Sequence, residues 1–284
     1  MPSGIIIIDK PSGWTSHDVV AKLRGIMRER RVGHGGTLDP MATGVLPVFV
    51  GRATRAVPYL PGEKTYLARF RTGFATDTLD ITGDITQRFD KTPSEEEIIS
   101  VLPQFTGRIM QIPPMVSALK KDGWPLYKLA RQGIEIEREP RPVFICSIEW
   151  LGCENREFMF RVRCSTGTYI RTLIDDIGRE LGCGACLSFL RREHSGPYSL
   201  EDAVPIEEAS PEKLMAVDTL FSDLPSHAVS AREEAALRHG GQVPASGLSE
   251  GARLRVYSQD GIFLLLGEVA NAKLKSLRGF FEVT

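Results

Sequence analysis

The stretch Gly33-His34-Gly35-Gly36-Thr37-Leu38-Asp39-Pro40-Met41-Ala42-Thr43-Gly44 decides how the first third of this 284-residue chain is organised. Its four glycines and its Asp-Pro pair favour tight backbone turns, so the stretch predicts an ordered loop and no regular element. The loop lies between a predicted helix and the apolar run Val45–Val50. Because loops held between regular elements often carry functional side chains, we take this one as the candidate site.

The elements around the loop follow from apolar periodicity. Ile5–Ile8 predicts a buried strand, and residues 16–30 predict a helix with Thr15 or Ser16 as its N-cap. Later segments predict strands over Tyr66–Phe74 and Phe158–Cys164, and helices over 94–102, 125–132 and 169–181. Residues 118–145 are rich in Lys and Arg, and we expect them to form a mobile loop.

A domain boundary is expected near 200–225, where acidic residues and prolines cluster. We place a main domain over residues 1–222 and a small β-rich module over 223–284, which is too small to be very stable alone and is expected to dock on the main domain. Within the module we predict a helix capped by Ser230 and Glu233, and strands over Leu254–Tyr257, Ile262–Leu266 and Phe280–Val283.

Charge is distributed unevenly along the chain, although its net value is only −1. Residues 1–72 carry 11 Lys/Arg and 5 Asp/Glu, a net charge of +6. Residues 73–199 carry 16 and 18 (−2), and residues 200–284 carry 8 and 13 (−5). The basic excess near the N-terminus predicts a polyanion-binding surface there, and the alternative is a charged face that is simply solvated.

Several classes of protein are disfavoured by missing motifs. The sequence contains no P-loop, no G-x-G-x-x-G and no H-E-x-x-H. Cys183 and Cys186 have the spacing of a redox pair or half a zinc site, but no second pair follows, so we interpret them as small residues packing a helix end. The apolar runs are too short for a membrane span and no signal peptide is evident, so we expect a cytoplasmic protein without membrane contact.

Asp39 is the only carboxylate in the candidate loop. An Asp before Pro is most often a turn former, and this is the alternative to a functional role. Three residues favour function. His34 has a flat polar ring that could stack or insert, Arg171 could keep a carboxylate ionised, and Tyr66 offers an aromatic face of the kind on which nucleobases stack.

A set of motifs in collinear order makes the match specific. The motifs are Asp9–Ser16, Gly33–Leu46, Lys64–Tyr66, Gly73–Asp80, Ile112–Lys120, Arg131–Glu135, Cys164–Arg171, Gly182–Ala185 and Leu190–Arg192. On these motifs, residues 4–195 resemble the bacterial tRNA pseudouridine-55 synthase family. Gly240–Val243 is the best local match to the small C-terminal PUA-like domain of that family, and it is a weak one.

The resemblance implies an α+β fold: a mixed, mainly antiparallel central sheet flanked by helices, with a small β-rich PUA-like module at the C-terminus. It implies that the enzyme isomerises one uridine, position 55 in the T-loop of tRNA, to pseudouridine. The partner would be the T-arm of tRNA, with no obligatory protein partner. No cofactor is expected, because the reaction gains and loses no atom.

The resemblance also implies a role for each candidate residue. Asp39 would be the catalytic carboxylate, Arg171 its paired arginine, and Tyr66 the ring that stacks on the extruded uracil. His34 would occupy the space vacated in the RNA stack. Tyr169 and Leu190 would line the uracil pocket, although either one alone would pass as a core residue.

Three chemical routes remain open for Asp39: attack on uracil C6, attack on ribose C1′, or removal of the C2′ proton with Tyr66 as a proton shuttle. Two other functions also remain open. One is the same chemistry on another RNA, guided or ribosomal. The other is an RNA chaperone that folds tRNA and does not need Asp39. A metal- or nucleotide-dependent hydrolase has no supporting motif.

Overall fold

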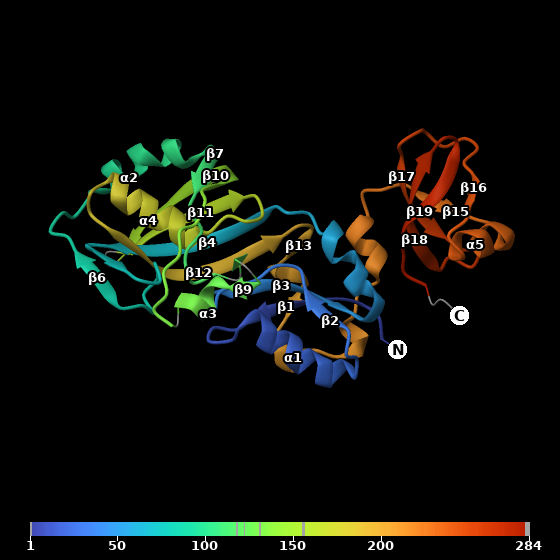
Figure 1. Cartoon of the computed structure of the whole chain (residues 1–284), viewed down its shortest axis with the longest axis horizontal. Helices are drawn as coiled ribbons and strands as arrows, with labels where there is room; N and C mark the ends of the chain where they lie inside the picture. Colours follow the sequence, from blue (N-terminus) through green and yellow to red (C-terminus); the bar gives the residue numbers. More distant parts are fainter. Residues whose placement is uncertain (1, 118, 122, 131, 155–156, 282–284) are drawn as a thin grey trace.

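The structure of the protein is a computed structural model that describes residues 2–117, 119–121, 123–130, 132–154 and 157–281. A ten-stranded mixed sheet forms its centre, with the strand order β14-β1-β3-β12-β4-β11-β10-β7, while β2 pairs with β3 and β13 with β12 (Figure 1). Its strands are β1 (Gly4–Lys10), β2 (Val32–His34), β3 (Thr43–Val50), β4 (Lys64–Thr72), β7 (Gly107–Gln111), β10 (Arg141–Glu154), β11 (Glu157–Cys164), β12 (Ala185–Ser195), β13 (Tyr198–Ser199) and β14 (Ala203–Val204). Among the described residues of this sheet, only the β1–β14 and β12–β3 strand pairs are parallel.

The remaining elements flank this sheet or form the C-terminal module. The helices are α1 (Ser16–Met27), α2 (Glu95–Val101), α3 (Leu126–Ala130), α4 (Ile170–Glu180) and α5 (Ala231–Arg238). Two small ladders pair β5 (Phe74–Thr76) with β6 (Ile85–Arg88) and β8 (Lys120–Lys121) with β9 (Trp124–Pro125). The predicted strand at Tyr66–Phe74 and the helices at 94–102, 125–132 and 169–181 are confirmed to within one or two residues at their ends.

The strand β1 is buried on both faces, which explains its uninterrupted apolar run. Because side chains alternate across a strand, Ile6 and Ile8 join the large core under α1 and α4, together with residues such as Leu46 and Phe160. Ile5 and Ile7 point the other way, into a second core. The side chains of β3, the strand that leads out of the candidate loop, alternate between the two cores in the same way.

Helix α1 begins at its expected cap and ends earlier than expected. The Thr15 side chain accepts from the backbone N–H of Asp18, and the Asp18 carboxylate accepts from the backbone N–H of Thr15, which makes a capping box. The helix was expected to reach residue 30 and ends at Met27. Arg28 adopts a left-handed conformation with φ of 49°, and its N–H closes the last turn.

The C-terminal module is a five-stranded sheet with α5 beside it, at the red end of Figure 1. Its strands are β15 (Ser226–Ala228), β16 (Gln242–Pro244), β17 (Arg253–Tyr257), β18 (Phe263–Ala270) and β19 (Lys273–Gly279). Ser230 and Glu233 form the expected capping box. The boundary after residue 222 stays a prediction.

The prediction of a strand over Phe280–Val283 is wrong for the residues that the structure describes, and residues 282 and 283 lie outside them. The strand is β19, and it ends at Gly279. Phe280 follows the end of β19, and its ring packs with Phe221 and Phe263 in the second core, which also holds Ile5. The module is therefore docked on the main domain, where Arg55 Nη1 also donates to the Gly279 carbonyl at 2.9 Å.

The outer face of β4, β11 and β12 is polar. Arg161 pairs there with Glu193 at 2.7 Å and Glu149 at 2.9 Å, and Arg71 pairs with Glu157 at 2.9 Å. Exposed pairs of this kind contribute little stability. Tyr66 and Leu190, at alternate positions of β4 and β12, lie instead in the large core on the opposite face.

Two expectations concern segments rather than single elements. Within 118–145 the described residues include β8, β9, α3 and the start of β10, while residues 118, 122 and 131 lie outside the description. The expected mobility of that segment stays a prediction. No helix among the described residues is long and apolar enough to cross a membrane.

Candidate active site

The candidate loop is a turn of residues 35–42 between β2 and β3, and a buried lysine holds it to the rest of the fold. Only its ends are regular, because His34 closes β2 and Thr43 opens β3. The Lys10 ammonium, fully buried, donates to the carbonyls of Pro11 at 2.8 Å, Trp14 at 2.6 Å and Pro40 at 3.2 Å. Burial lowers the pKa of Lys10 to about 8. The residue next to Asp39 is thereby tied to the loop that precedes α1.

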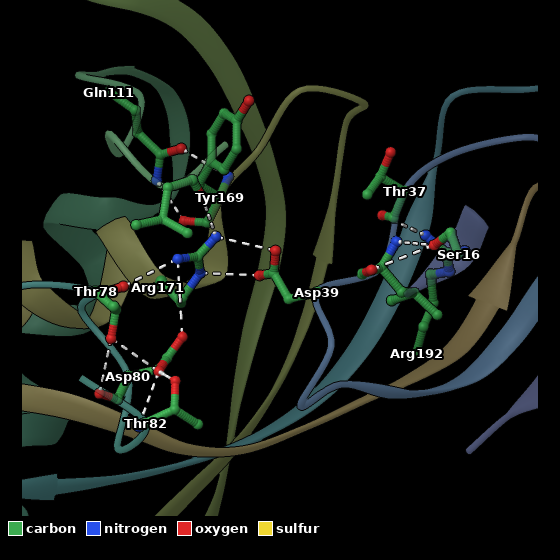
Figure 2. Close-up of polar contacts among 12 residues, drawn as sticks. Ser16, Thr37, Asp39, Thr78, Asp80, Thr82, Gln111, Tyr169, Arg171 and Arg192 are labelled. Carbon is green, nitrogen blue, oxygen red and sulfur yellow. Dashed lines mark hydrogen bonds and ion pairs between the residues drawn. The ribbon is translucent and has the colours of Figure 1, made fainter. Parts of the chain in front are cut away.

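Ser16 and Arg192 hold the same turn from two other sides. The Ser16 hydroxyl accepts from the Leu38 N–H at 2.8 Å and lies 3.2 Å from the Leu38 carbonyl. The fully buried Arg192 donates to the carbonyls of Val45 at 2.7 Å, Gly36 at 3.2 Å and Thr37 at 3.4 Å. Figure 2 shows Ser16, Thr37 and Arg192 together behind the turn. Gly44 is required there, since its φ is +101° and a Cβ would come 2.2 Å from the Arg192 carbonyl oxygen.

Asp39 projects from this turn onto Arg171, as the sequence predicted (Figure 2). Arg171 Nε lies 2.8 Å from Asp39 Oδ2, and Nη2 donates to Oδ1 at 3.0 Å. This two-point fork fixes the plane of the carboxylate. The arginine side chain is 2% exposed, whereas that of Asp39 is 30% exposed. The carboxylate therefore keeps surface that a substrate can reach.

Arg171 has a second carboxylate on its far side, which the sequence did not single out. Its Nη1 lies 3.7 Å from Asp80 Oδ2 and donates to the Thr78 carbonyl at 2.9 Å. Asp80 Oδ1 accepts from the Thr78 hydroxyl at 2.9 Å and from the backbone N–H and hydroxyl of Thr82. The turn occupies Oδ1, so the 6% exposed Asp80 side chain faces Arg171 through Oδ2 and offers a substrate almost no surface.

The pKa of Asp39 is raised above its ordinary value, because the carboxylate is desolvated. The paired Arg171 opposes the shift by opposite charge and hydrogen bonding, and the negative Asp80 adds to it. Arg171 by itself lowers the pKa of Asp39, which agrees with the expectation that it favours the ionised carboxylate. A carboxylate of raised pKa is a stronger base once it is ionised.

Gln111 and Tyr169 position the helix that carries Arg171. Gln111, buried at the end of β7, accepts from the Tyr169 N–H at 3.0 Å and donates to the Tyr169 carbonyl at 3.3 Å. Tyr169 is the N-cap residue of α4. The Val116 carbonyl accepts from Arg171 Nη2 at 2.8 Å. The segment after β7 thus closes directly over the arginine.

Tyr66 and Leu190 are more deeply buried than exposed binding groups would be. Tyr66 is 6% exposed on β4, and Leu190 is 5% exposed on the adjoining β12, in register with Ala68. Both belong to the large core. Burial raises the pKa of Tyr66, so its phenol stays protonated near neutral pH. These two residues form part of a wall beside the site and leave little surface free.

His34 lies at the end of β2, at the entrance to the turn. Its Nδ1 accepts from the Gly36 N–H at 3.3 Å. Burial lowers its pKa, and the neighbouring Arg192, His17 and Lys64 lower it further. The ring is therefore neutral at pH 7, which suits a side chain that would insert among stacked bases.

The structure thus brings Asp39, Arg171 and Tyr169 together, with Tyr66, His34 and Leu190 on the strands around them. Sequence reasoning missed Asp80 and Gln111, and it gave Ser16 and Arg192 no function in the site. A signal for Asp80 was present, because Thr78 and Thr82 flank it at two residues on either side.

Cys183 and Cys186, which have the spacing of a redox pair, are buried inside the fold. The described chain contains no group of three or more His, Cys, Asp or Glu residues arranged to hold a metal ion. Cys183 and Cys186 are buried free thiols, and burial raises the pKa of each. Their interpretation as packing residues agrees with this burial.

Comparison with protein families matches almost the whole chain. Residues 24–170 match the N-terminal domain of the TruB family pseudouridylate synthases. Residues 171–224 match the tRNA pseudouridylate synthase B C-terminal domain, and residues 225–280 match the C-terminal model of pseudouridine synthase II TruB.

Curated relatives and solved structures give the same result. A tRNA pseudouridine synthase B of Synechococcus elongatus is 45% identical over 277 residues, covering 94% of each chain. The one of Pseudomonas syringae is 42% identical over 280 residues, covering 94% of this chain and 92% of the relative. A crystal structure of a Cbf5–Nop10–Gar1 complex matches with a TM-score of 0.72 and 30% identity, over 98% of this chain and 85% of that chain. The expected fold class is confirmed, and the chain belongs to the TruB family of pseudouridylate synthases.

Proposed function

We propose that this protein converts uridine 55 in the T-loop of tRNA to pseudouridine, with Asp39 as the reacting carboxylate. The observation that carries the proposal is the Asp39–Arg171 fork, in which a fully buried guanidinium fixes a carboxylate that is still 30% exposed. The relatives named tRNA pseudouridine synthase B support tRNA as the substrate. The T-arm is the part of the tRNA that would enter the site.

The reaction breaks the N1–C1′ bond, turns the uracil, and joins C5 to C1′. The proton lost from C5 is balanced by one gained at N1, so the atoms balance without a cofactor. The reacting base has to leave the RNA stack first, which costs a few kcal/mol. Stacking on an aromatic ring can return ~1–3 kcal/mol per base, a role we give to Tyr66, while His34 would fill the emptied position.

Asp39 would act by one of three routes: attack at C6, attack at C1′, or removal of the C2′ proton. All three need the ionised carboxylate and a fixed approach, and the Arg171 fork supplies both. In all three, the free uracil has to be held until it reattaches. Tyr169 and the apolar Leu190 would form the walls that retain it.

The test is pseudouridine mapping of an unmodified tRNA transcript after incubation with wild type and with Asp39→Asn. We expect wild type to convert the T-loop uridine alone, and Asp39→Asn to bind the tRNA without converting it. Asp90→Asn, an exposed carboxylate on the same domain, is the matched control and should behave as wild type. Conversion by Asp39→Asn would remove the carboxylate assignment, and tight binding without any conversion by wild type would favour the RNA-chaperone function.

A further inference from the structure

Lys64 places a second cation against the candidate loop. It is the first residue of β4 and is partly buried. A Cβ built on Gly36 would stand 3.1 Å from the Lys64 ammonium and 3.8 Å from Arg192 Nη1. His34, two residues before Gly36, lies close enough for the charges of Arg192 and Lys64 to lower its pKa. Two cations and a histidine therefore meet at one point of the backbone.

This positive charge is not balanced within the described part of the chain. Neither Lys64 nor Arg192 makes an ion pair with a described carboxylate within 4.0 Å. Arg192 donates hydrogen bonds to three carbonyls, and these neutral acceptors do not cancel its positive charge. Burial and the charge of Arg192 lower the pKa of Lys64 to about 8, so the lysine is mostly protonated at pH 7. Holding two cations together in this way is unfavourable until an anion arrives.

The position of Lys64 indicates which anion that would be. Side chains at alternate positions of a strand share a face, so Lys64 lies on the same face of β4 as Tyr66. Gly36 is three residues from Asp39 in the same turn. A nucleotide whose base reaches Tyr66 and whose ribose reaches Asp39 therefore has its backbone beside Lys64.

We propose that Lys64, with Arg192 behind it, forms a binding site for one phosphodiester group next to the reacting nucleotide. The inference rests on the proposed function, because it takes an RNA substrate as given. The anion would restore the neutrality that the free protein lacks. It would also hold the backbone while the base is out of the stack, since phosphate contacts fix register and orientation.

The first experiment measures binding of a tRNA transcript in the Asp39→Asn background, so that no conversion intervenes. Adding Lys64→Met should weaken binding about tenfold, the size of one charge-assisted contact. It should also reduce the slope of log Kd against log salt by about 0.7–0.9, the value for one phosphate. Lys64→Arg should restore both, and Lys213→Met, an exposed lysine outside the site, should change neither.

The second experiment locates the phosphate with synthetic T-arm hairpins that each carry one neutral methylphosphonate near the target uridine. At one linkage the loss should not add to that of Lys64→Met, because both changes remove the same contact. Additive losses at every linkage, or an unchanged Kd and salt slope for Lys64→Met, would overturn the inference. If wild type neither binds nor converts the tRNA, the proposed function fails first. If it does both and Lys64→Met matches it, only this inference fails.

Discussion

Two turns bring a carboxylate to Arg171, and they are built in opposite ways. The turn of residues 35–42 carries Asp39 and is held from outside, by Lys10, Ser16 and Arg192. The turn of residues 76–82 carries Asp80 and is held from within, because its own threonines bind the Asp80 carboxylate and carbonyl. The Asp80 side chain is 6% exposed, against 30% for Asp39.

The difference between the two turns separates a carboxylate that can react from one that can only position Arg171. A turn that is held by distant elements can leave its own side chain free, so Asp39 keeps oxygen surface for a substrate. A turn that uses its carboxylate to hold itself together leaves almost no carboxylate surface for a substrate. Asp80 can therefore act on the reaction only through Arg171, and the predictions below test this division from its largest effect to its smallest.

The largest effect separates the two carboxylates directly. We expect Asp80→Asn to lower kcat about a hundredfold, because Arg171 loses a charged neighbour and shifts, while Asp39→Asn leaves no measurable conversion. Binding of tRNA should stay within about twofold of wild type in both variants, because contacts of Lys and Arg with phosphates supply most of the affinity. Single-turnover rates and filter binding check this. Equal losses of kcat in the two variants would break the comparison.

The outside support of the Asp39 turn is tested by Ser16→Ala. Its loss leaves the buried Leu38 N–H without a partner, which costs about 1–3 kcal/mol. Denaturant unfolding should show that decrease in the free energy of unfolding. Ser12→Ala, which removes one exposed hydrogen bond to the Met41 carbonyl, is the control and should cost well under half as much. Equal costs for the two serines would mean that the turn does not depend on this support.

The shared arginine has a support of its own in Gln111. Gln111→Glu keeps the acceptor for the Tyr169 N–H and removes the donor to its carbonyl, so α4 should shift slightly at its first turn. We expect kcat to fall about tenfold at unchanged KM, less than the ~10²-fold cost of a 1 Å misplacement. Gln104→Glu, an exposed glutamine on the same domain, should keep wild-type rates. A change in KM alone would assign Gln111 to substrate binding instead.

The smallest effect is a shift in pH dependence. Since the reaction needs ionised Asp39, kcat/KM is present above the pKa of that carboxyl and is lost as pH falls through it. Desolvation places this acid limb above the ordinary value of 3.8. The negative charge of Asp80 raises the pKa of Asp39, so Asp80→Asn should move the limb to lower pH even as kcat falls. A limb that moves to higher pH in this variant would contradict the coupling.

The contact between Asp39 and Arg171 was expected from the family resemblance, which the two motifs around these residues carry, and the structure shows it. The sequence also predicted the α1 and α4 helices, whose apolar spacing and caps are local signals. Asp80 and Gln111 were missed because their partners, Arg171 and Tyr169, lie 91 and 58 residues away and only the fold joins them.

The errors in the C-terminal module have a similar cause. Phe280 has strong β propensity, and Lys273–Gly279 has less, so the strand was placed too late. Tertiary packing decided otherwise, because Phe280 finds a core on the main domain.

The second core has a consequence for the order in which the protein can be made. Ile5 pairs with Met215 through two backbone hydrogen bonds and packs in the same cluster as Phe280, so the beginning and the end of the chain close one core. At about 5–20 residues per second, the ribosome delivers Phe280 tens of seconds after Ile5. During that interval other members of the cluster, such as Phe49 and Leu220, can already cover Ile5. The nascent chain therefore completes this core only once Phe280 has been added.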